Sequence, residues 1–166
     1  MMQKRVYIDM DGVLCEYKEN ATLEEMKTDG YFRSLSPRAA TVEAVKYLIR
    51  SKFAEVFILS SVFPERVSQA SAEKNEWIDK YLPEIKHDHR IFTLCGKSKA
   101  EFLGSVNAGD ILCDDYSKNL AAWTHAGGSA IKILNEVNGK GGTFTEGLRL
   151  DITSKEDLLG AVLSIA

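Results

Sequence analysis

The chain has 166 residues, of which 45% are hydrophobic and 27% charged, and its formal net charge at pH 7 is -3. This length fits a single domain with a real core, and the slightly acidic charge argues against a general affinity for nucleic-acid polymers or anionic membranes. The three cysteines lack a Cys-x-x-Cys spacing, which argues against a disulfide framework or a zinc site. The apolar runs are too short for a signal peptide or a membrane span, so we expect a cytoplasmic protein with a small ligand.

Short apolar segments predict buried strands, because each combines β-branched, leucine or aromatic residues in one run. In chain order they cover residues 5–9, 55–60, 90–94, 110–114 and 130–134. Longer segments with helical periodicity lie between and after them, at residues 41–50, 64–82, 117–128 and 153–165. The second helical segment begins with Pro64, and the last begins with Thr153 and Glu156 in capping-box spacing.

This alternation of strands and helices predicts an α/β fold built on a doubly wound parallel sheet. We expect residues 1–166 to form one domain. Sheets of this kind bind their ligands outside the carboxyl ends of the strands, near the point where the strand order reverses. The polar residues that follow the strands are therefore the first candidates for a functional site.

Carboxylate, hydroxyl and ammonium groups gather at the ends of the first four predicted strands. In chain order they belong to Asp9, Asp11, Ser60, Ser61, Lys97, Lys99, Asp114 and Asp115. Carboxylates crowded at one point raise one another's pKa values unless a cation lies among them. Oxygen ligands without histidine or cysteine favour Mg²⁺, which shares its ligand shell with a substrate phosphate. The pattern therefore predicts Mg²⁺-dependent phosphoryl transfer.

The spacing of Asp9 and Asp11 allows two acids to divide the chemistry. Asp9 is predicted to be the nucleophile that forms an aspartyl phosphate, and Asp11 to protonate the leaving oxygen and then to activate water. Gly12 allows the chain to turn close to the substrate. We expect Ser60 and one lysine to bind the remaining phosphate oxygens.

Other interpretations of the same residues stay open. An Asp-x-Asp pair also occurs in sugar-nucleotide transferases, whereas a calcium loop is excluded because Leu14 and Asn20 stand where that loop needs glycine and glutamate. Ser60 and Ser61 can instead cap the following helix. A lysine near a helix start is commonly a solvated side chain.

The stretches DMDGVL, FILSS and ILCDDYSKNL, together with Lys97, resemble the four ordered motifs of the haloacid dehalogenase superfamily. Because Asp11 is present, the resemblance implies the phosphatase branch and a Rossmann-like fold. It further implies that Mg²⁺ is held by Asp9, Asp115 and the backbone carbonyl of Asp11. Asp114 is then expected to hold a metal-bound water or a neighbouring group.

Longer stretches, such as GYFRSLSPRAATVEAVKYL and CDDYSKNLAAWTHAGGSAIKILN, are similar to the cytosolic type C 5'-nucleotidases, the 5'(3')-deoxyribonucleotidases. The similarity implies a deoxyribonucleoside monophosphate as substrate, Lys97 rather than Lys99 as the phosphate lysine, and Ser61 as a further phosphate ligand. It also implies a helical cap, for which the chain has room only at about residues 17–36. The aromatic side chains expected to stack on a base there are Tyr17, Tyr31 and Phe32.

The sequence thus predicts a phosphatase of deoxynucleoside monophosphates. Two alternatives stay open, namely a related phosphatase of sugar phosphates or other small metabolites and a phosphate-binding domain without catalysis. The presence of both Asp9 and Asp11 argues for an enzyme. Whether a homodimer closes the small cap is also left open.

Overall fold

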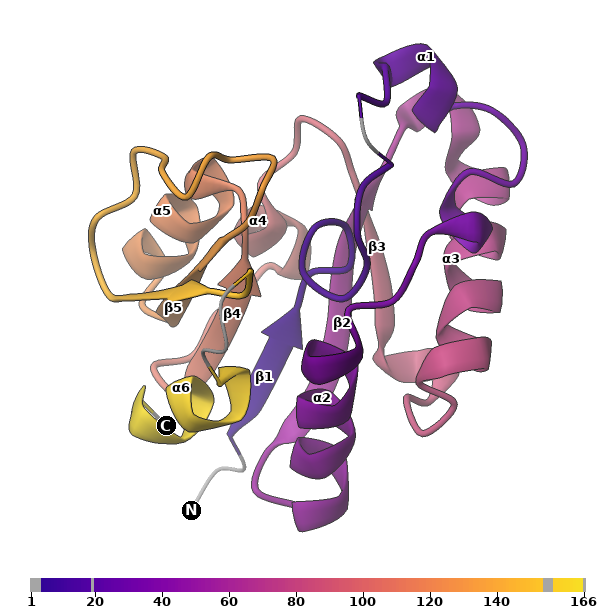
Figure 1. Cartoon of the computed structure of the whole chain (residues 1–166). Coiled ribbons are helices and arrows are strands. Elements are labelled where there is room, and N and C mark those ends of the chain that lie inside the picture. The colour runs from indigo at the N-terminus through magenta and orange to yellow at the C-terminus, as the bar shows by residue number, and fades with distance from the viewer. Residues whose placement is uncertain (1–3, 19, 154–156, 166) are drawn as a thin grey trace.

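The protein is built on one parallel sheet with helices on both faces (Figure 1). The computed structural model describes residues 4–18, 20–153 and 157–165. Within these residues the sheet has the strand order β3-β2-β1-β4-β5-β6, and every neighbouring pair is parallel. The strands are β1 (Arg5–Ile8), β2 (Glu55–Val62), β3 (Arg90–Leu94), β4 (Asp110–Asp114), β5 (Ser129–Leu134) and β6 (Leu148–Asp151).

The predicted doubly wound α/β fold is confirmed, and the predicted strands lie close to their expected bounds. The sequence does not predict β6, an edge strand of four residues. Its sequence, Leu-Arg-Leu-Asp, is too short to show a clear period, and it follows a glycine-rich loop. Pairing with β5 decides its conformation.

The helices in the described residues are α1 (Leu23–Met26), α2 (Ala39–Ser51), α3 (Val67–Tyr81), α4 (Lys99–Leu103), α5 (Ser117–His125) and α6 (Leu158–Ile165), with 3-10 turns η1 (Phe32–Ser34), η2 (Pro64–Arg66) and η3 (His87–His89). The helical segment predicted to start at Pro64 begins as the turn η2 and continues as α3. The last helix is predicted from Thr153, but α6 begins at Leu158 and Thr153 lies in a turn; Glu156 of the predicted capping pair lies outside the described residues. None of the described helices is both long and apolar enough to cross a membrane.

Alternate residues of each strand point to opposite faces of the sheet, and this divides the core into two layers. Val6 and Ile8 of β1 pack in the layer formed with α2, α3 and α6, which includes Trp77 of α3. Tyr7 packs in the other layer with α4 and α5, against Trp123 of α5. A polar residue at a strand end therefore faces either α3 or α4 according to its position in this alternation.

Strands β1 and β4 are neighbours at the centre of the sheet although they are distant in sequence. Ile8 pairs with Cys113, and the backbone N–H of Asp9 donates to the carbonyl of Cys113 at 2.9 Å. From β1 the chain moves outward through β2 and β3, and it then returns to β4 and moves outward on the other side. The strand order therefore reverses between β1 and β4, where such folds place their ligand site.

The cap segment (residues 17–36) lies between β1 and α2 and contains α1 and η1. In Figure 1, α1 lies beside one end of α3, on the side to which the carboxyl end of β1 points. Lys27, which directly follows α1, pairs with Glu65 of η2 at 2.6 Å. The cap segment is thus placed beside the carboxyl ends of the strands.

At the opposite, amino-terminal ends of β1 and β4, an ion pair joins the two strands. Arg5 Nε donates to Asp110 Oδ1 at 2.8 Å, and the backbone N–H of Asn107 donates to Asp110 Oδ2, also at 2.8 Å. Asp110 is only 2% exposed, so its carboxylate depends on these partners.

We expect Asp110→Asn to lower the free energy of unfolding by about 2 kcal/mol, because the amide leaves the Arg5 charge without its partner and turns a donor toward Arg5 or Asn107. Denaturant unfolding followed by tryptophan fluorescence measures the change. The control is Glu43→Gln, which removes an exposed ion pair to Lys46 and should leave the unfolding midpoint unchanged. Equal shifts in both variants would contradict a specific role for the Arg5–Asp110 pair.

Candidate active site

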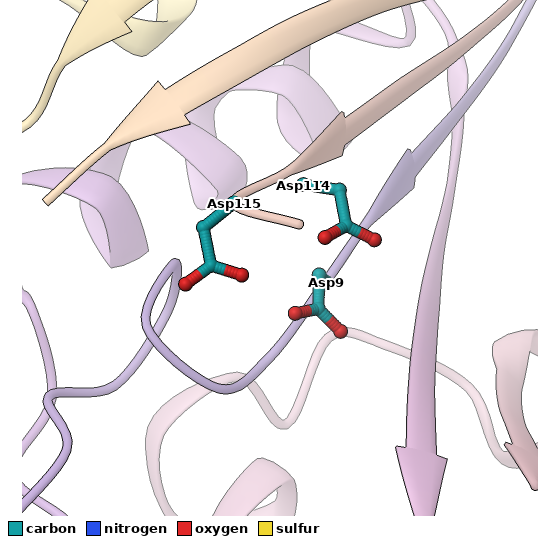
Figure 2. A group of neighbouring side chains, drawn as sticks. All are labelled: Asp9, Asp114 and Asp115. Atoms are coloured by element: carbon teal, nitrogen blue, oxygen red, sulfur yellow. The ribbon is translucent and has the colours of Figure 1, made fainter. Parts of the chain in front are cut away.

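Three carboxylates converge at the carboxyl ends of β1 and β4. Asp9 directly follows β1, Asp114 is the last residue of β4, and Asp115 follows it. Figure 2 shows the three side chains pointing toward one another, and one oxygen of each lies within 4.8 Å of the others. Like charges this close repel, so the arrangement requires protons or cations among them.

Lys99 supplies one of these cations. Its ammonium group donates to Asp9 Oδ1 at 2.8 Å and to Asp114 Oδ2 at 2.7 Å, and the residue is 1% exposed. Burial by itself lowers the pKa of Lys99, but the charges of Asp114 and Asp9 outweigh it and raise the pKa above its usual value. The side chain therefore stays protonated between the two carboxylates.

Lys99, and not Lys97, which is the predicted phosphate lysine, is the residue that meets the carboxylates. Lys97 is an exposed residue in the lining of the cleft, two positions before α4 begins. Ser98 caps α4, since its Oγ accepts from the backbone N–H of Glu101, and Lys99 is then the first residue of the helix. The Ser98-x-x-Glu101 spacing is a sequence signal that locates this helix start.

Both carboxylate oxygens of Asp114 accept hydrogen bonds from other groups of the protein. It is fully buried, and its Oδ2 accepts from Lys99 and from Asn119 Nδ2, the latter at 2.9 Å. Its Oδ1 accepts from the backbone N–H of Tyr116 at 2.7 Å. Asp114 is thus held in place as a support for Lys99.

Like Asp114, Asp115 lines the cleft. Its Oδ2 accepts from Asn135 Nδ2 at 2.8 Å. Burial, together with the charges of Asp114 and Asp9, raises the pKa of Asp115 to about 8. A cation bound beside it would stabilise the ionised form, so Asp115 is better placed than Asp114 to bind one.

Gly12 packs directly against Asp115. Its φ is +77°, a conformation that glycine adopts without strain. A Cβ at this position would lie 2.5 Å from Asp115 Oδ2 and 2.8 Å from Asn135 Nδ2. Asn135 also donates to the Gly12 carbonyl at 3.0 Å, so one amide holds both the turn after β1 and the Asp115 carboxylate. Asn135 follows β5 without a recognisable motif, so the sequence carries no signal for its role.

Asp11 interacts with a second buried lysine, Lys74 of α3, which the sequence analysis also misses. Lys74 Nζ donates to Asp11 Oδ2, to Ser60 Oγ at 2.8 Å and to the Ser61 carbonyl at 3.0 Å. Burial raises the pKa of Asp11, against the opposing effect of the Lys74 charge. A signal for this role exists, because the charged pair Glu73 and Lys74 interrupts the apolar stripe of α3.

Ser60 and Ser61 point to opposite faces of the sheet, because successive strand residues alternate. Ser60 is fully buried, with its Oγ 3.5 Å from Asp11 Oδ2, and it is not part of the cleft lining. Ser61 lines the cleft, and its Oγ lies 3.0 Å from Thr93 Oγ1. The structure thus brings Ser61 to the cleft and turns Ser60, the predicted phosphate ligand, toward Lys74.

An open cleft of about 790 Å³ lies over these groups, a volume typical of small-molecule sites. Asp9, Asp11 and Asp115 all line it. The cap segment contributes apolar side chains to the same lining, namely Tyr17, Leu23, Met26 and Phe32. Tyr31 does not line the cleft; it is buried and packs edge to face against the Phe32 ring, with the ring centroids 5.2 Å apart.

The donor set of the cluster fits a hard divalent cation. Within the described residues the cluster consists of the carboxylates of Asp9, Asp114 and Asp115, with no histidine or cysteine among them. Oxygen donors of this kind suit Mg²⁺, which also keeps part of its shell for water or a phosphate. The carboxylate of Asp11 is outside the cluster, because it turns to Lys74.

The protein family described as "5' nucleotidase, deoxy (Pyrimidine), cytosolic type C protein" matches residues 17–143 of the chain. The matched range contains Ser61, Lys99 and Asp115, and it begins after Asp9 and Asp11. No curated protein sequence shows a significant match to the chain.

Similar folds occur among solved structures. The D,D-heptose 1,7-bisphosphate phosphatase from Burkholderia thailandensis has a TM-score of 0.60 and 16% identity, covering 98% of this chain and 97% of that chain. The same enzyme from B. bronchiseptica, complexed with magnesium and phosphate, has a TM-score of 0.63 and 12% identity, covering 97% and 96%. An L-2-haloacid dehalogenase from Xanthobacter autotrophicus has a TM-score of 0.50 and 12% identity, covering 80% and 78%. These likenesses confirm a haloacid dehalogenase-like α/β fold.

We expect Gly12→Ala to weaken the binding of Mn²⁺, used as a probe for Mg²⁺, by about 10- to 100-fold, because the added methyl group displaces the Asp115 carboxylate. Titration calorimetry measures the affinity. Gly104→Ala is the matched control, since Gly104 has a φ of +73° and nothing within 4 Å of an added Cβ. An equal loss of affinity in both variants would show that backbone strain, rather than contact with Asp115, is responsible.

Proposed function

Since the chain belongs to the cytosolic type C 5'-nucleotidase family and is therefore a phosphoric monoester hydrolase, we propose that it removes phosphate from deoxynucleoside monophosphates with the help of Mg²⁺. The observation that carries the proposal is the placement of Asp9. Lys99 holds one oxygen of its carboxylate, and Asp9 and Asp115 line the same cleft. A carboxylate fixed beside a cation site is suited to attack phosphorus.

The first step is attack of Asp9 on the substrate phosphate. Because Lys99 holds Oδ1, we assign the attack to Asp9 Oδ2. The bond between Oδ2 and phosphorus forms, the bond between phosphorus and the ester oxygen breaks, and that oxygen takes a proton from Asp11. Burial raises the pKa of Asp11, which favours the protonated form that this transfer needs.

The second step is hydrolysis of the aspartyl phosphate. Asp11 takes a proton from a water molecule as the water oxygen attacks phosphorus, and the bond to Asp9 Oδ2 breaks. Inorganic phosphate leaves, and both carboxyl groups return to their starting states. Lys74 holds Asp11 Oδ2 throughout, which keeps the acid in place relative to the cleft.

Asp9, Asp115 and the backbone carbonyl of Asp11 are the groups that we expect to hold Mg²⁺. When bound, the ion neutralises negative charge on the phosphate oxygens. The similar structure from B. bronchiseptica contains magnesium and phosphate, which supports this choice of cation. Ser61 and Lys99 are the expected phosphate ligands from the protein, while Asp114 supports Lys99.

The lining of the cleft supports a substrate with a flat apolar part. Tyr17 and Phe32 of the cap segment line the same cleft as the reacting carboxylates. Aromatic faces stack on nucleobases with little demand on base identity. We therefore infer that residues 17–36 act as the cap of a single catalytic domain, with the base between the cap and the sheet.

A phosphatase of sugar phosphates is the second candidate. The likeness in fold to heptose bisphosphate phosphatases favours it, and so do Lys97 and Lys118, two exposed residues of the cleft lining that suit a polar, anionic substrate. A phosphate-binding domain without catalysis does not fit the family match, and Asp9 and Asp11 both line the cleft.

We expect the protein to release phosphate from dUMP, dTMP and dAMP faster than from glucose 6-phosphate or fructose 6-phosphate, and only when Mg²⁺ is present. Asp9→Asn should lower kcat by about 10⁴-fold or more, because an amide cannot form the covalent intermediate. Phosphate release is measured for each substrate with this variant as the blank. Faster turnover of sugar phosphates would show that the substrate is a sugar phosphate rather than a nucleotide. An unchanged kcat in Asp9→Asn would show that Asp9 is not the nucleophile.

Two lysine variants test the geometric assignment of the phosphate lysine. Lys99→Gln should lower kcat by about 100- to 1,000-fold, because it removes the charge that lies between Asp9 and Asp114. Lys97→Gln changes an exposed side chain and should alter kcat by less than about threefold. Steady-state kinetics at saturating Mg²⁺ measures both, and a larger loss in Lys97→Gln would reverse the assignment.

A further inference from the structure

A buried carboxylate, Glu73 of α3, holds the main chain of the cap segment. Glu73 Oε1 accepts from the backbone N–H of Gly30 at 2.8 Å, and Oε2 accepts from the backbone N–H of Phe32 at 3.0 Å. Glu73 is 1% exposed, with Gln69 Nε2 at 3.1 Å and an Arg33 nitrogen at 3.7 Å as further partners. A buried carboxylate is costly without such donors, so these contacts favour one position of the cap main chain.

The backbone at Gly30 suits this carboxylate. Gly30 has a φ of +81°, and Tyr31 after it is in the right-handed helical region. Successive residues of opposite hand turn their N–H groups toward a common anion. A Cβ at Gly30 would have no atom closer than 4.0 Å, so steric crowding does not require glycine at this position. The positive φ favours glycine instead.

Other contacts tie the same segment to the core. One turn after Glu73 on α3, Trp77 Nε1 donates to the Leu35 carbonyl at 2.8 Å. At the middle of the segment, Lys27 pairs with Glu65 of η2 at 2.6 Å. Residues 27–35 of the cap segment are therefore attached to the core at several points.

Lys74, the neighbour of Glu73, links the cap segment to the catalytic acid. The Lys74 ammonium group lies 4.5 Å from the centre of the Phe32 ring and also donates to the Asp11 carboxylate. Phe32 lines the cleft, while its backbone N–H is bound by Glu73. Adjacent residues of one helix thus set the positions of the aromatic wall and of Asp11.

We propose that Glu73 is a positioning residue that determines substrate selectivity, because it fixes Phe32 as a preformed wall of the cleft at a set distance from Asp11. This inference rests on the proposed function, in which the cleft binds a phosphomonoester. Substrates are then selected by their fit to a static wall, without closure of the cap over each one.

Glu73→Gln and Glu76→Gln form a matched pair of variants. Both residues belong to α3 and lie near Arg33, but Glu76 is on the surface, with its side chain 54% exposed. Glutamine keeps the size of Glu73 but turns an amide donor toward one of the two backbone donors. Amide hydrogen exchange in the full chain should become at least about 10-fold faster at Gly30 and Phe32 in Glu73→Gln, and should not change in Glu76→Gln.

Selectivity is the second readout. It is the ratio of kcat/KM for the monoester that the wild-type protein hydrolyses fastest, among dUMP, dTMP, dAMP and the sugar phosphates, to kcat/KM for acetyl phosphate. Glu73→Gln should lower this ratio by about 10-fold, chiefly through KM for the larger substrate, because acetyl phosphate is too short to contact the wall. Phe32→Leu removes the ring but keeps the anchor, so it should lower the ratio while leaving exchange at Gly30 unchanged.

Unchanged exchange in Glu73→Gln would overturn the anchoring role, and faster exchange with an unchanged ratio would overturn the role in selectivity. The numerator of the ratio is the monoester that the wild-type protein hydrolyses fastest, whether it is a nucleotide or a sugar phosphate. A preference for sugar phosphates would therefore refute the proposed nucleotide substrate while the same measurements still decide the role of Glu73. Absence of all turnover in the wild-type protein would refute the phosphatase mechanism, and the selectivity role with it.

Discussion

Negative charge gathered at the carboxyl ends of parallel strands must be balanced, and the rest of the site depends on how this protein balances it. Lys99 binds Asp9, Lys74 binds Asp11, and both lysines are almost fully buried. A buried ammonium group or carboxylate is unstable alone, so each group holds its place only through its partners. The carboxylate of Asp115 has the amide of Asn135 as its partner, and this leaves it suited to a bound cation.

The two lysines reach the site from opposite layers of the fold. Asp9 lies on the same face of the sheet as Tyr7 and meets Lys99 of α4, whereas Asp11 meets Lys74 of α3 on the other face. The proposed nucleophile and the proposed acid therefore have separate electrostatic surroundings although they are two residues apart. Separate surroundings are what allow two neighbouring carboxyl groups to hold different protonation states. The same helix that holds the acid also anchors the cap segment, through Glu73.

Much of the fold was predictable from the sequence, because strand and helix periods are local properties of the chain. The predicted strands, their parallel arrangement and the gathering of Asp9 and Asp115 at neighbouring strand ends are all present. The strand β6 was not predictable in this way, because its alternating pattern is short and its extended conformation depends on pairing with β5. The burial of Ser60 against Lys74 was not predictable either, because a difference of one residue in a strand reverses the face that a side chain occupies.

By itself, the sequence determined the order of the first five strands and of the longer helices, the family and the acidic groups available at the strand ends. The tertiary structure alone decided which lysine meets which carboxylate, and that Glu73 binds the cap segment. These contacts join residues that are 90, 63 and 41 positions apart in the chain. They depend on sheet face, strand register and the exact start of a helix, which are set when the layers pack together and have no local signature strong enough to read beforehand.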